Sequence, residues 1–226
     1  MSQAAVLTLP IPRAWSWRVP RRWAGRALIV FVAFLVAGNL AIQGVSLFAR
    51  STMAAGRVEG VDGVGKLRTV DDAVWRGAHP SRSGYRALAG AGVTVVVDLR
   101  AEDDAAENDA YIEGLGMQVV HLPIRDGQTP SSDDVERFLS VVGESRGTVF
   151  VHCGAGVGRT GAMVAAYLMA TDQAGGPGTV LGRNLAVGPP SLEQIVFAAN
   201  GGDQPNAVVT AVSRTLDAPR RILAIL

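Results

Sequence analysis

The stretch TVFVHCGAGVGRTGAMVAAYLMA, Thr148 to Ala170, decides the fold. It begins with Thr148–His152, a β-branched and aromatic run that is typical of a strand buried on both faces. A glycine-rich loop follows, and an apolar segment that starts near Thr160 predicts a helix. Cys153, the only cysteine in the chain, comes directly after the strand. A strand, a tight loop and a helix in this order indicate an α/β domain with its chemistry at the carboxyl end of a strand.

The same alternation of strands and helices recurs upstream of this stretch. Strands are predicted over Ala73–Gly77, Val93–Arg100 and Met117–Ile124, and helices over Pro80–Gly92 and Ser131–Ser145. The acidic segment Ala101–Gly116 is interpreted as a loop and helix whose charges form a solvated surface. We therefore expect an α/β fold with a central, mostly parallel sheet covered by helices on both faces.

Composition excludes several classes of function. The net charge is +1 and no basic stripe is present, so the sequence does not favour binding to nucleic acid. A single cysteine forms no internal disulfide and makes a poor zinc site. Cys153 is therefore either an inert buried thiol or a reactive one.

The N-terminal part of the chain carries a candidate membrane anchor. Residues Ala27–Phe48 contain no charged side chain over 22 residues, which as a helix covers roughly the 30 Å hydrocarbon layer of a bilayer. Basic and aromatic residues precede this segment: Arg13, Trp15, Trp17, Arg18, Arg21, Arg22, Trp23 and Arg26. By the positive-inside rule we expect a cytoplasmic N-terminus, with everything after Phe48 outside the cytoplasm. A cleaved signal peptide and a soluble core helix remain as alternatives.

The domain organisation follows from these segments. We predict a basic N-terminal segment over 1–26, a transmembrane anchor over 27–48, a Gly-rich linker over 49–66, one globular domain over 67–200 and an extension over 201–226. Within the extension, Ser213–Leu226 is interpreted as an amphipathic helix or a surface for a partner.

The loop after Cys153 predicts an anion site. Glycines at 154, 156 and 158 let successive backbone N–H groups point into one hollow at a helix N-terminus. This positive potential favours the thiolate of Cys153, which is its nucleophilic form. Arg159 adds a planar fork that grips two oxygens of a phosphate. Two other interpretations compete: a dinucleotide fingerprint, Gly156-x-Gly158-x-x-Gly161, which lacks the acidic residue about 20 positions on, and a structural glycine turn beside an inert thiol.

HCGAGVGRTG resembles the signature loop of the cysteine-based protein tyrosine and dual-specificity phosphatases: His-Cys, five residues, Arg, Ser or Thr, Gly. The resemblance extends upstream, where HLPIRDGQTPSSDDVERFLSVV is similar to the segment that carries the family's mobile general acid. VWRGAHPSRSGYRALAGAGVTVVVDLR is similar to the opening of small atypical members, so the similarity covers roughly Val74 to Ala170. Rhodaneses and some arsenate reductases also place a cysteine in an anion loop, but they account less well for the aspartate segment.

The resemblance implies a mechanism that needs no metal or cofactor. Cys153 is the expected nucleophile, Asp126 the general acid, and Arg159 the group that stabilises the transferred phosphoryl group. His152 and Thr160 are expected to support them, His152 by orienting the loop and Thr160 by a hydrogen bond to the sulfur. The phosphate is expected to bind the loop amides of Gly154, Ala155, Gly156, Val157 and Gly158.

Several further assignments follow for neighbouring residues and for the substrate. Asp98 and Arg100 are predicted to form an ion pair or cap. Gln194 is a weak candidate for handling the attacking water, because the family's usual glutamine position falls on Pro190. The uncharged loop favours a phosphorylated protein as substrate, and the membrane anchor favours a phospholipid head group as the alternative. A pseudophosphatase that binds phosphorylated partners without turnover is the non-enzymatic hypothesis.

Overall fold

The computed structural model describes residues 21–53, 56, 58, 61–102 and 104–223. Residues 1–20 of the predicted basic segment lie outside the described residues, as do parts of the predicted linker and the last three residues. The described residues form one five-stranded sheet. Its order is β1 (Arg68–Thr69), β2 (Val74–Ala78), β5 (Thr148–Cys153), β3 (Val93–Arg100) and β4 (Gln118–Ile124).

The sheet is mostly parallel, as predicted. β2, β5, β3 and β4 run parallel, and only the two-residue β1 is antiparallel to its neighbour β2. The register places Ala78 opposite Cys153 and Asp98 opposite His152. The carboxyl ends of these three strands therefore meet at one edge, where parallel α/β sheets bind their ligands.

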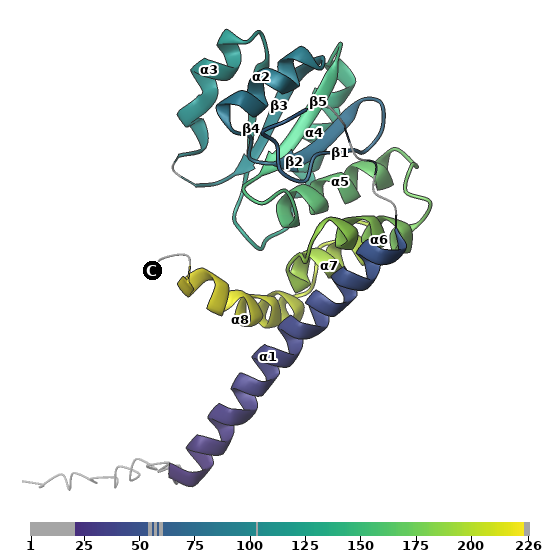
Figure 1. Cartoon of the computed structure of the whole chain (residues 1–226). Helices are drawn as coiled ribbons and strands as arrows, with labels where there is room; N and C mark the ends of the chain where they lie inside the picture. Colours follow the sequence, from purple (N-terminus) through teal and green to yellow (C-terminus); the bar gives the residue numbers. More distant parts are fainter. Residues whose placement is uncertain (1–20, 54–55, 57, 59–60, 103, 224–226) are drawn as a thin grey trace, which may run out of the picture.

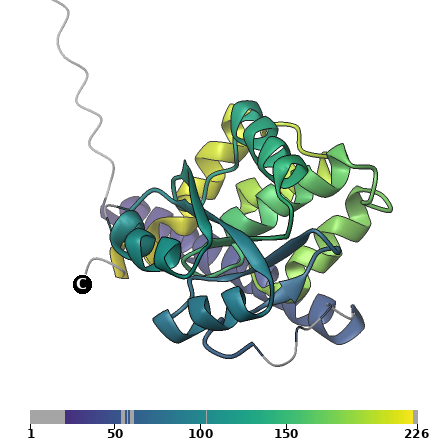
Figure 2. The ribbon, with the colours of Figure 1, turned by 90° about the horizontal axis from the view of Figure 1, so that it is seen from above.

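Helices cover both faces of the sheet (Figures 1 and 2). On one face α2 (Arg82–Gly90) and α3 (Asp109–Gly114), which follows the 3-10 turn η1 (Ala105–Asn108), bury Tyr85, Leu88 and Ile112. On the other face α4 (Ser132–Glu144) and α5 (Gly158–Ala170) bury Phe138 and Met163. Both cores include β-branched residues of the strands, so the apolar side chains of the strands are buried on both faces of the sheet.

The boundaries of the predicted elements change by a few residues. α5 begins at Gly158, two residues before the predicted start, because the loop backbone already turns into the helix there. α4 begins after Ser131, which accepts a hydrogen bond from the backbone N–H of Asp134, while the Asp134 carboxylate bonds back to Ser131. This reciprocal cap confirms the predicted helix start.

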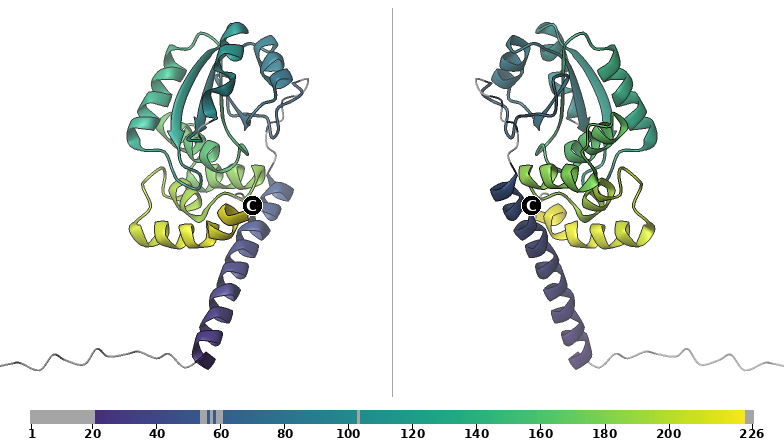
Figure 3. Two further views of the ribbon diagram at one scale, coloured as in Figure 1. Left: turned by 90° about the vertical axis from the view of Figure 1, so that its left-hand side faces the viewer. Right: turned by 90° about the vertical axis from the view of Figure 1, so that its right-hand side faces the viewer.

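The N-terminal helix α1 (Arg21–Thr52) is longer than the predicted anchor. Its stretch Trp23–Thr52 is the one helix among the described residues that is long and apolar enough to cross a membrane, by length and composition. The helix continues past Phe48 because Ala49 is buried against Leu185 and Ala186, and it occupies the start of the predicted linker over 49–66. Figure 3 shows α1 leaving the base of the domain as a straight rod.

The chain after α5 folds into three helices that join α1 to the domain. These are α6 (Pro177–Val187), α7 (Leu192–Ala199) and α8 (Ala207–Leu223). α8 begins six residues before the predicted helix, because the Asn206 side chain caps it by accepting from the amides of Val208 and Val209. α6 and α8 both pack against α1, so the region predicted as an extension is part of the folded body (Figure 1).

Candidate active site

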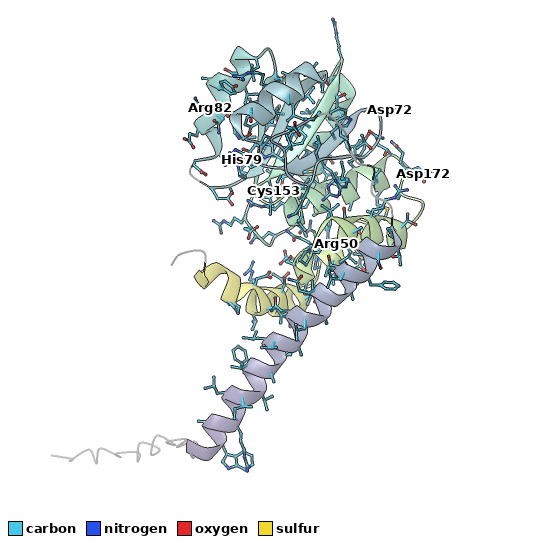
Figure 4. All side chains as sticks on the ribbon, in the orientation of Figure 1. Arg50, Asp72, His79, Arg82, Cys153 and Asp172 are labelled. Carbon is cyan, nitrogen blue, oxygen red and sulfur yellow. The ribbon has the colours of Figure 1, made fainter. Side chains whose placement is uncertain are left out.

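Cys153 is the last residue of β5 and lies near the centre of the domain, in the same region as His79 (Figure 4). Its side chain is buried, and it begins the loop Cys153–Arg159, which we call the cysteine loop. The backbone N–H of His79, just after β2, donates to the carbonyl of Gly154 at 3.0 Å. The two adjacent strand ends are thus joined at the point where the loop starts.

The carbonyl groups of the cysteine loop bond to donors outside it. Besides Gly154, the carbonyl of Ala155 accepts from Nζ of Lys66 at 3.1 Å. The carbonyls of Gly156 and Val157 both accept from Nη2 of Arg76, at 3.2 and 3.3 Å. Because a peptide N–H points opposite to its C=O, these contacts favour the amide groups turning into the hollow above Cys153. Such a nest of amides binds an anion.

The bend of the loop requires glycine at position 156. Gly156 has a φ of +68°, in the left-handed region, and a Cβ there would lie 2.4 Å from the backbone nitrogen of Ala78. Any side chain would collide with the end of β2. The glycine spacing predicted from the sequence therefore serves both the curl of the loop and its contact with the neighbouring strand.

Arg159 is buried at the start of α5 and is held by Glu102, which lies just after β3. Nη1 and Nη2 of Arg159 each donate to one carboxylate oxygen of Glu102 at 2.9 Å, and Nη1 also donates to the carbonyl of Ile124 at 3.2 Å. Burial, the largest single effect, would raise the pKa of Glu102. The hydrogen bonds and the charge of Arg159, together with backbone hydrogen bonds, outweigh it and hold this pKa below its usual value. The Glu102 side chain is 47% exposed, as predicted for the acidic segment Ala101–Gly116. The sequence did not predict its pairing with Arg159, which arises because strand order brings the end of β3 beside β5.

Asp126 lies beside the same arginine. Its Oδ1 is 3.4 Å from Nε of Arg159, and the Asp126 side chain is 74% exposed. Nε is buried and forms no hydrogen bond with the described residues. The structure thus brings together Cys153, Arg159 and Asp126, the three residues to which the sequence assigns the main chemistry.

The loop that carries Asp126 is fixed by the start of α7. Ser191 Oγ donates to the carbonyl of Gly127 at 2.8 Å, and Gln194 Nε2 donates to the carbonyl of Gln128 at 2.9 Å. Gln194 Oε1 accepts from the backbone N–H of Ser191, so both ends of this buried amide are engaged. Gln194 therefore contacts the Asp126 loop and packs beside Gly158 of the cysteine loop.

His152 is buried behind Cys153 and is neutral at pH 7, because burial lowers its pKa to about 4. Nδ1 lies 3.3 Å from the Cys153 carbonyl and must donate to it, so Nε2 accepts from the hydroxyl of Tyr85 at 3.4 Å. These contacts fix the imidazole ring, and the orienting role of His152 stays a prediction. Asp98, 3.8 Å from Nδ1, forms the predicted ion pair with Arg100 at 2.8 Å.

Thr160 does not form its predicted bond to the sulfur in this structure. Its hydroxyl is fully buried and makes no hydrogen bond with any described residue. Thr160 lies in the first turn of α5.

Sequence reasoning missed the supports of the cysteine loop. Arg76 is 4% exposed, and besides the loop carbonyls it donates through Nη1 to Oδ1 of Asn184 on α6. Asn184 in turn donates to the carbonyl of Gly161 at 2.9 Å. A charged residue inside the otherwise apolar strand VWRGA was the only local signal, because the partners of Arg76 lie 80 or more residues away.

Comparison with known proteins identifies relatives of this arrangement. A family model described as "DSP-PTPase phosphatase fused to NAD+ Kinase" matches residues 56–194, more than half of the chain. A rice protein named probable NAD kinase 2, chloroplastic, is 34% identical over 103 residues, 42% of this chain and 10% of that protein. Human dual specificity protein phosphatase CDC14A is 50% identical over 77 residues, 34% of this chain and 12% of that protein. The chain thus spans about a tenth of the length of these relatives.

Solved structures share the fold. TpbA of P. aeruginosa superposes with a TM-score of 0.53 at 21% identity, over 74% of this chain and 98% of TpbA. PTPMT1, solved in complex with PI(5)P, superposes with a TM-score of 0.51 at 18% identity, over 65% of this chain and 97% of PTPMT1. At these identities the likeness concerns the arrangement of helices and strands.

Proposed function

Because the chain belongs to the family of dual-specificity phosphatase domains, we propose that it hydrolyses phosphate monoesters through a phosphocysteine intermediate. One observation carries the proposal: Arg159, which follows Cys153 at the other end of the cysteine loop, lies within 3.4 Å of Asp126 at the carboxyl edge of the sheet. A nucleophile, an anion clamp and a proton donor thereby surround one hollow.

The first chemical step forms the phosphocysteine. The thiolate of Cys153 attacks phosphorus, the ester P–O bond breaks, and Asp126 gives its proton to the leaving oxygen. The loop amides stabilise the charge on the equatorial oxygens, together with the side of the Arg159 guanidinium formed by Nε and the Nη2 hydrogen next to it. Glu102 holds the end of the guanidinium formed by Nη1 and Nη2, so the arginine is oriented before substrate arrives.

The second step releases phosphate. Water attacks phosphorus while Asp126, now a carboxylate, takes its proton, and the S–P bond breaks to regenerate the thiolate. Gln194 lies between the two loops, but its amide is bound to backbone groups. The proposal therefore gives the activation of water to Asp126 alone.

Phosphotyrosine and other phosphorylated side chains of proteins are the substrates that we propose first. The positions between Cys153 and Arg159 carry no charge, so the loop offers a single phosphate site and no added attraction for a polyphosphorylated ring. A phospholipid head group is the second candidate, favoured by the apolar helix α1.

We further propose that α1 anchors the chain in a membrane with its N-terminus in the cytoplasm. The support is its length and composition together with the arginines that precede residue 27. A cysteine-reactive reagent, compared in intact and permeabilised cells carrying Arg137→Cys in a Cys153→Ser background, distinguishes the two topologies, because position 137 is exposed on α4. Labelling that requires permeabilisation would reverse this assignment.

The activity test uses the full chain in detergent micelles. We expect it to hydrolyse a small aryl phosphate in EDTA, with turnover abolished by Cys153→Ser and lowered about 10²-fold or more by Asp126→Ala. The loss of turnover caused by Asp126→Ala should be smaller for an aryl phosphate whose leaving phenol is strongly acidic, because that phenolate leaves without being protonated. A folded wild-type protein that binds inorganic phosphate without turnover would instead establish the pseudophosphatase hypothesis.

A further inference from the structure

Behind the cysteine loop lies a second cavity, of about 260 Å³, between the β1–β2 hairpin, α5 and α6. Three arginines from different elements line it: Arg68 of β1, Arg76 of β2 and Arg183 of α6. The remaining lining residues that the structure describes are uncharged. The described wall of this cavity is thus strongly cationic.

The charge of Arg76 is poorly compensated by the described residues. Nη1 and Nη2 donate to amide oxygens, which carry no net charge, and the buried Nε makes no hydrogen bond with a described residue. Burial, together with the charge of Arg68, lowers the pKa of Arg76 to about 10 despite the opposing effect of the Cys153 thiolate. A buried cation without an anionic partner destabilises the folded chain, because burial removes its hydration.

The register brings a second cation to the same place. Arg68 and Arg76 are direct partners across the antiparallel pair β1–β2, and like charges opposite one another on a sheet destabilise it. Arg183 is exposed on α6 at the mouth of the cavity, beside Asn184. An anion among these three groups would offset both the burial and the mutual repulsion.

We propose that this cavity binds a phosphate group, at a site separate from the catalytic hollow. The volume accommodates a phosphate and a few attached atoms. Two sources share this chemistry: a free phosphate ion and the head group of an anionic phospholipid. The end of α1 is close by, because Met53 packs against Gly182, the neighbour of Arg183, so a lipid beside α1 is within the surroundings of the cavity.

Binding at this cavity is linked to the cysteine loop through Arg76. The same guanidinium that faces the cavity holds the carbonyls of Gly156 and Val157. An anion that fixes Arg76 also fixes the loop amides. By thermodynamic linkage, an anion bound in the cysteine loop in turn raises the affinity of the cavity for its own anion.

The first arm of the test measures binding of inorganic phosphate by calorimetry to the full chain in detergent. Arg159→Ala removes the anion clamp of the catalytic hollow, so the remaining binding reports on the cavity. We expect Arg159→Ala/Arg183→Ala to weaken this binding at least tenfold and Arg159→Ala/Arg137→Ala, an exposed arginine of α4, to leave it unchanged. Arg183 is exposed, so its removal does not threaten folding.

The second arm measures the thermal unfolding midpoint in phosphatidylcholine micelles with and without phosphatidic acid. A rise with phosphatidic acid that Arg183→Ala removes and Arg137→Ala keeps assigns the site to a lipid head group; phosphate binding alone assigns it to a free anion. Binding in neither arm, or equal losses in both variants, overturns the proposal. Because no arm requires turnover, this failure is distinct from failure of the phosphatase activity.

Discussion

Arg159 uses its two edges for different purposes. The end formed by Nη1 and Nη2 is held by both oxygens of Glu102, while on the other side Nε lies 3.4 Å from Oδ1 of Asp126. Paired, planar hydrogen bonds of this kind fix the orientation of a guanidinium as well as its charge. In the proposed mechanism Glu102 is therefore a positioning residue, although its carboxylate also adds a negative charge near the proposed anion site.

We expect Glu102→Gln to lower kcat/KM for an aryl phosphate about tenfold, because the guanidinium loses one charged partner and its fixed direction. The fall should be larger in kcat than in 1/KM if Glu102 orients Arg159 for the transition state. Steady-state kinetics of the full chain measure both, with Glu107→Gln on the neighbouring turn as control. A rise in activity would show that Glu102 competes with the substrate.

At the scale of elements, the carboxyl ends of β2, β5 and β3 meet at a buried imidazole. His152 of β5 bonds to Tyr85 of α2 and to its own neighbour Cys153, and lies 3.8 Å from Asp98 of β3. Burial keeps the ring neutral in the folded protein, whereas in the unfolded chain it titrates near its ordinary pKa of about 6.5. Protonation of His152 therefore opposes the joining of these elements.

The sign of the resulting pH dependence follows from the lowered pKa. Between pH of about 6.5 and about 4 the unfolded chain binds a proton that the folded chain does not, so the free energy of unfolding falls as pH is lowered, by up to about 3 kcal/mol. We expect His152→Gln to flatten this part of the curve in denaturant titrations. His121→Gln, on β4, is the control, and equal slopes for wild type and His152→Gln would contradict the assignment.

For the whole molecule, α1 is both the most exposed apolar element and a structural part of the domain. Leu28, Ile29 and Val30 are exposed on the half that leaves the domain, whereas Ser46 donates to the carbonyl of Leu185 at 2.7 Å and Asn39 donates to that of Leu216 at 3.2 Å. Two polar residues within the apolar segment, Asn39 and Ser46, thus bond to α8 and α6 respectively. They lock the helix onto the domain.

Removal of residues 1–52 should therefore destabilise the remaining chain. It uncovers Leu185 and Ala186 together with Leu181 and Ile195, and it leaves the Leu185 carbonyl without its donor. We expect the thermal midpoint in detergent to fall by about 5 °C or more relative to the full chain. Leu28→Ala, on the outer half of α1, should leave the midpoint unchanged, and equal midpoints for the truncated and full chains would show that α1 is only a tether.

The sequence was sufficient for features written in local patterns. The β-branched run at Val93–Arg100 predicted β3 with its exact bounds, and Ser131 with Asp134 predicted the start of α4. Cys153, Arg159 and Asp126 were assigned because their segments resemble those of the phosphatase family, and the structure places Asp126 beside Arg159. Asp98 and Arg100 were predicted to form an ion pair or a cap, and they form an ion pair at 2.8 Å.

Contacts between distant segments were beyond the sequence. Arg76 reaches Asn184 across 108 positions, and Glu102 reaches Arg159 across 57, so no local pattern marks either pair. The docking of α8 on α1 depends on Leu216 filling the space beside Gly38, which only the folded chain reveals. Side chains that support a site are for this reason harder to predict than those that perform its chemistry.

The packing of α1 along α6 and α8 also limits where the protein can act. A domain joined to its anchor by a flexible tether samples many heights above the membrane and many tilts. A helix bonded to the domain at Asn39 and Ser46 instead holds the domain in one orientation. If α1 spans a bilayer, the opening above Cys153 stays at a fixed distance from the lipid surface. The site then meets only substrates within a thin layer parallel to the membrane. A substrate that reaches this layer has a high effective concentration at the site, and a substrate outside it has almost none.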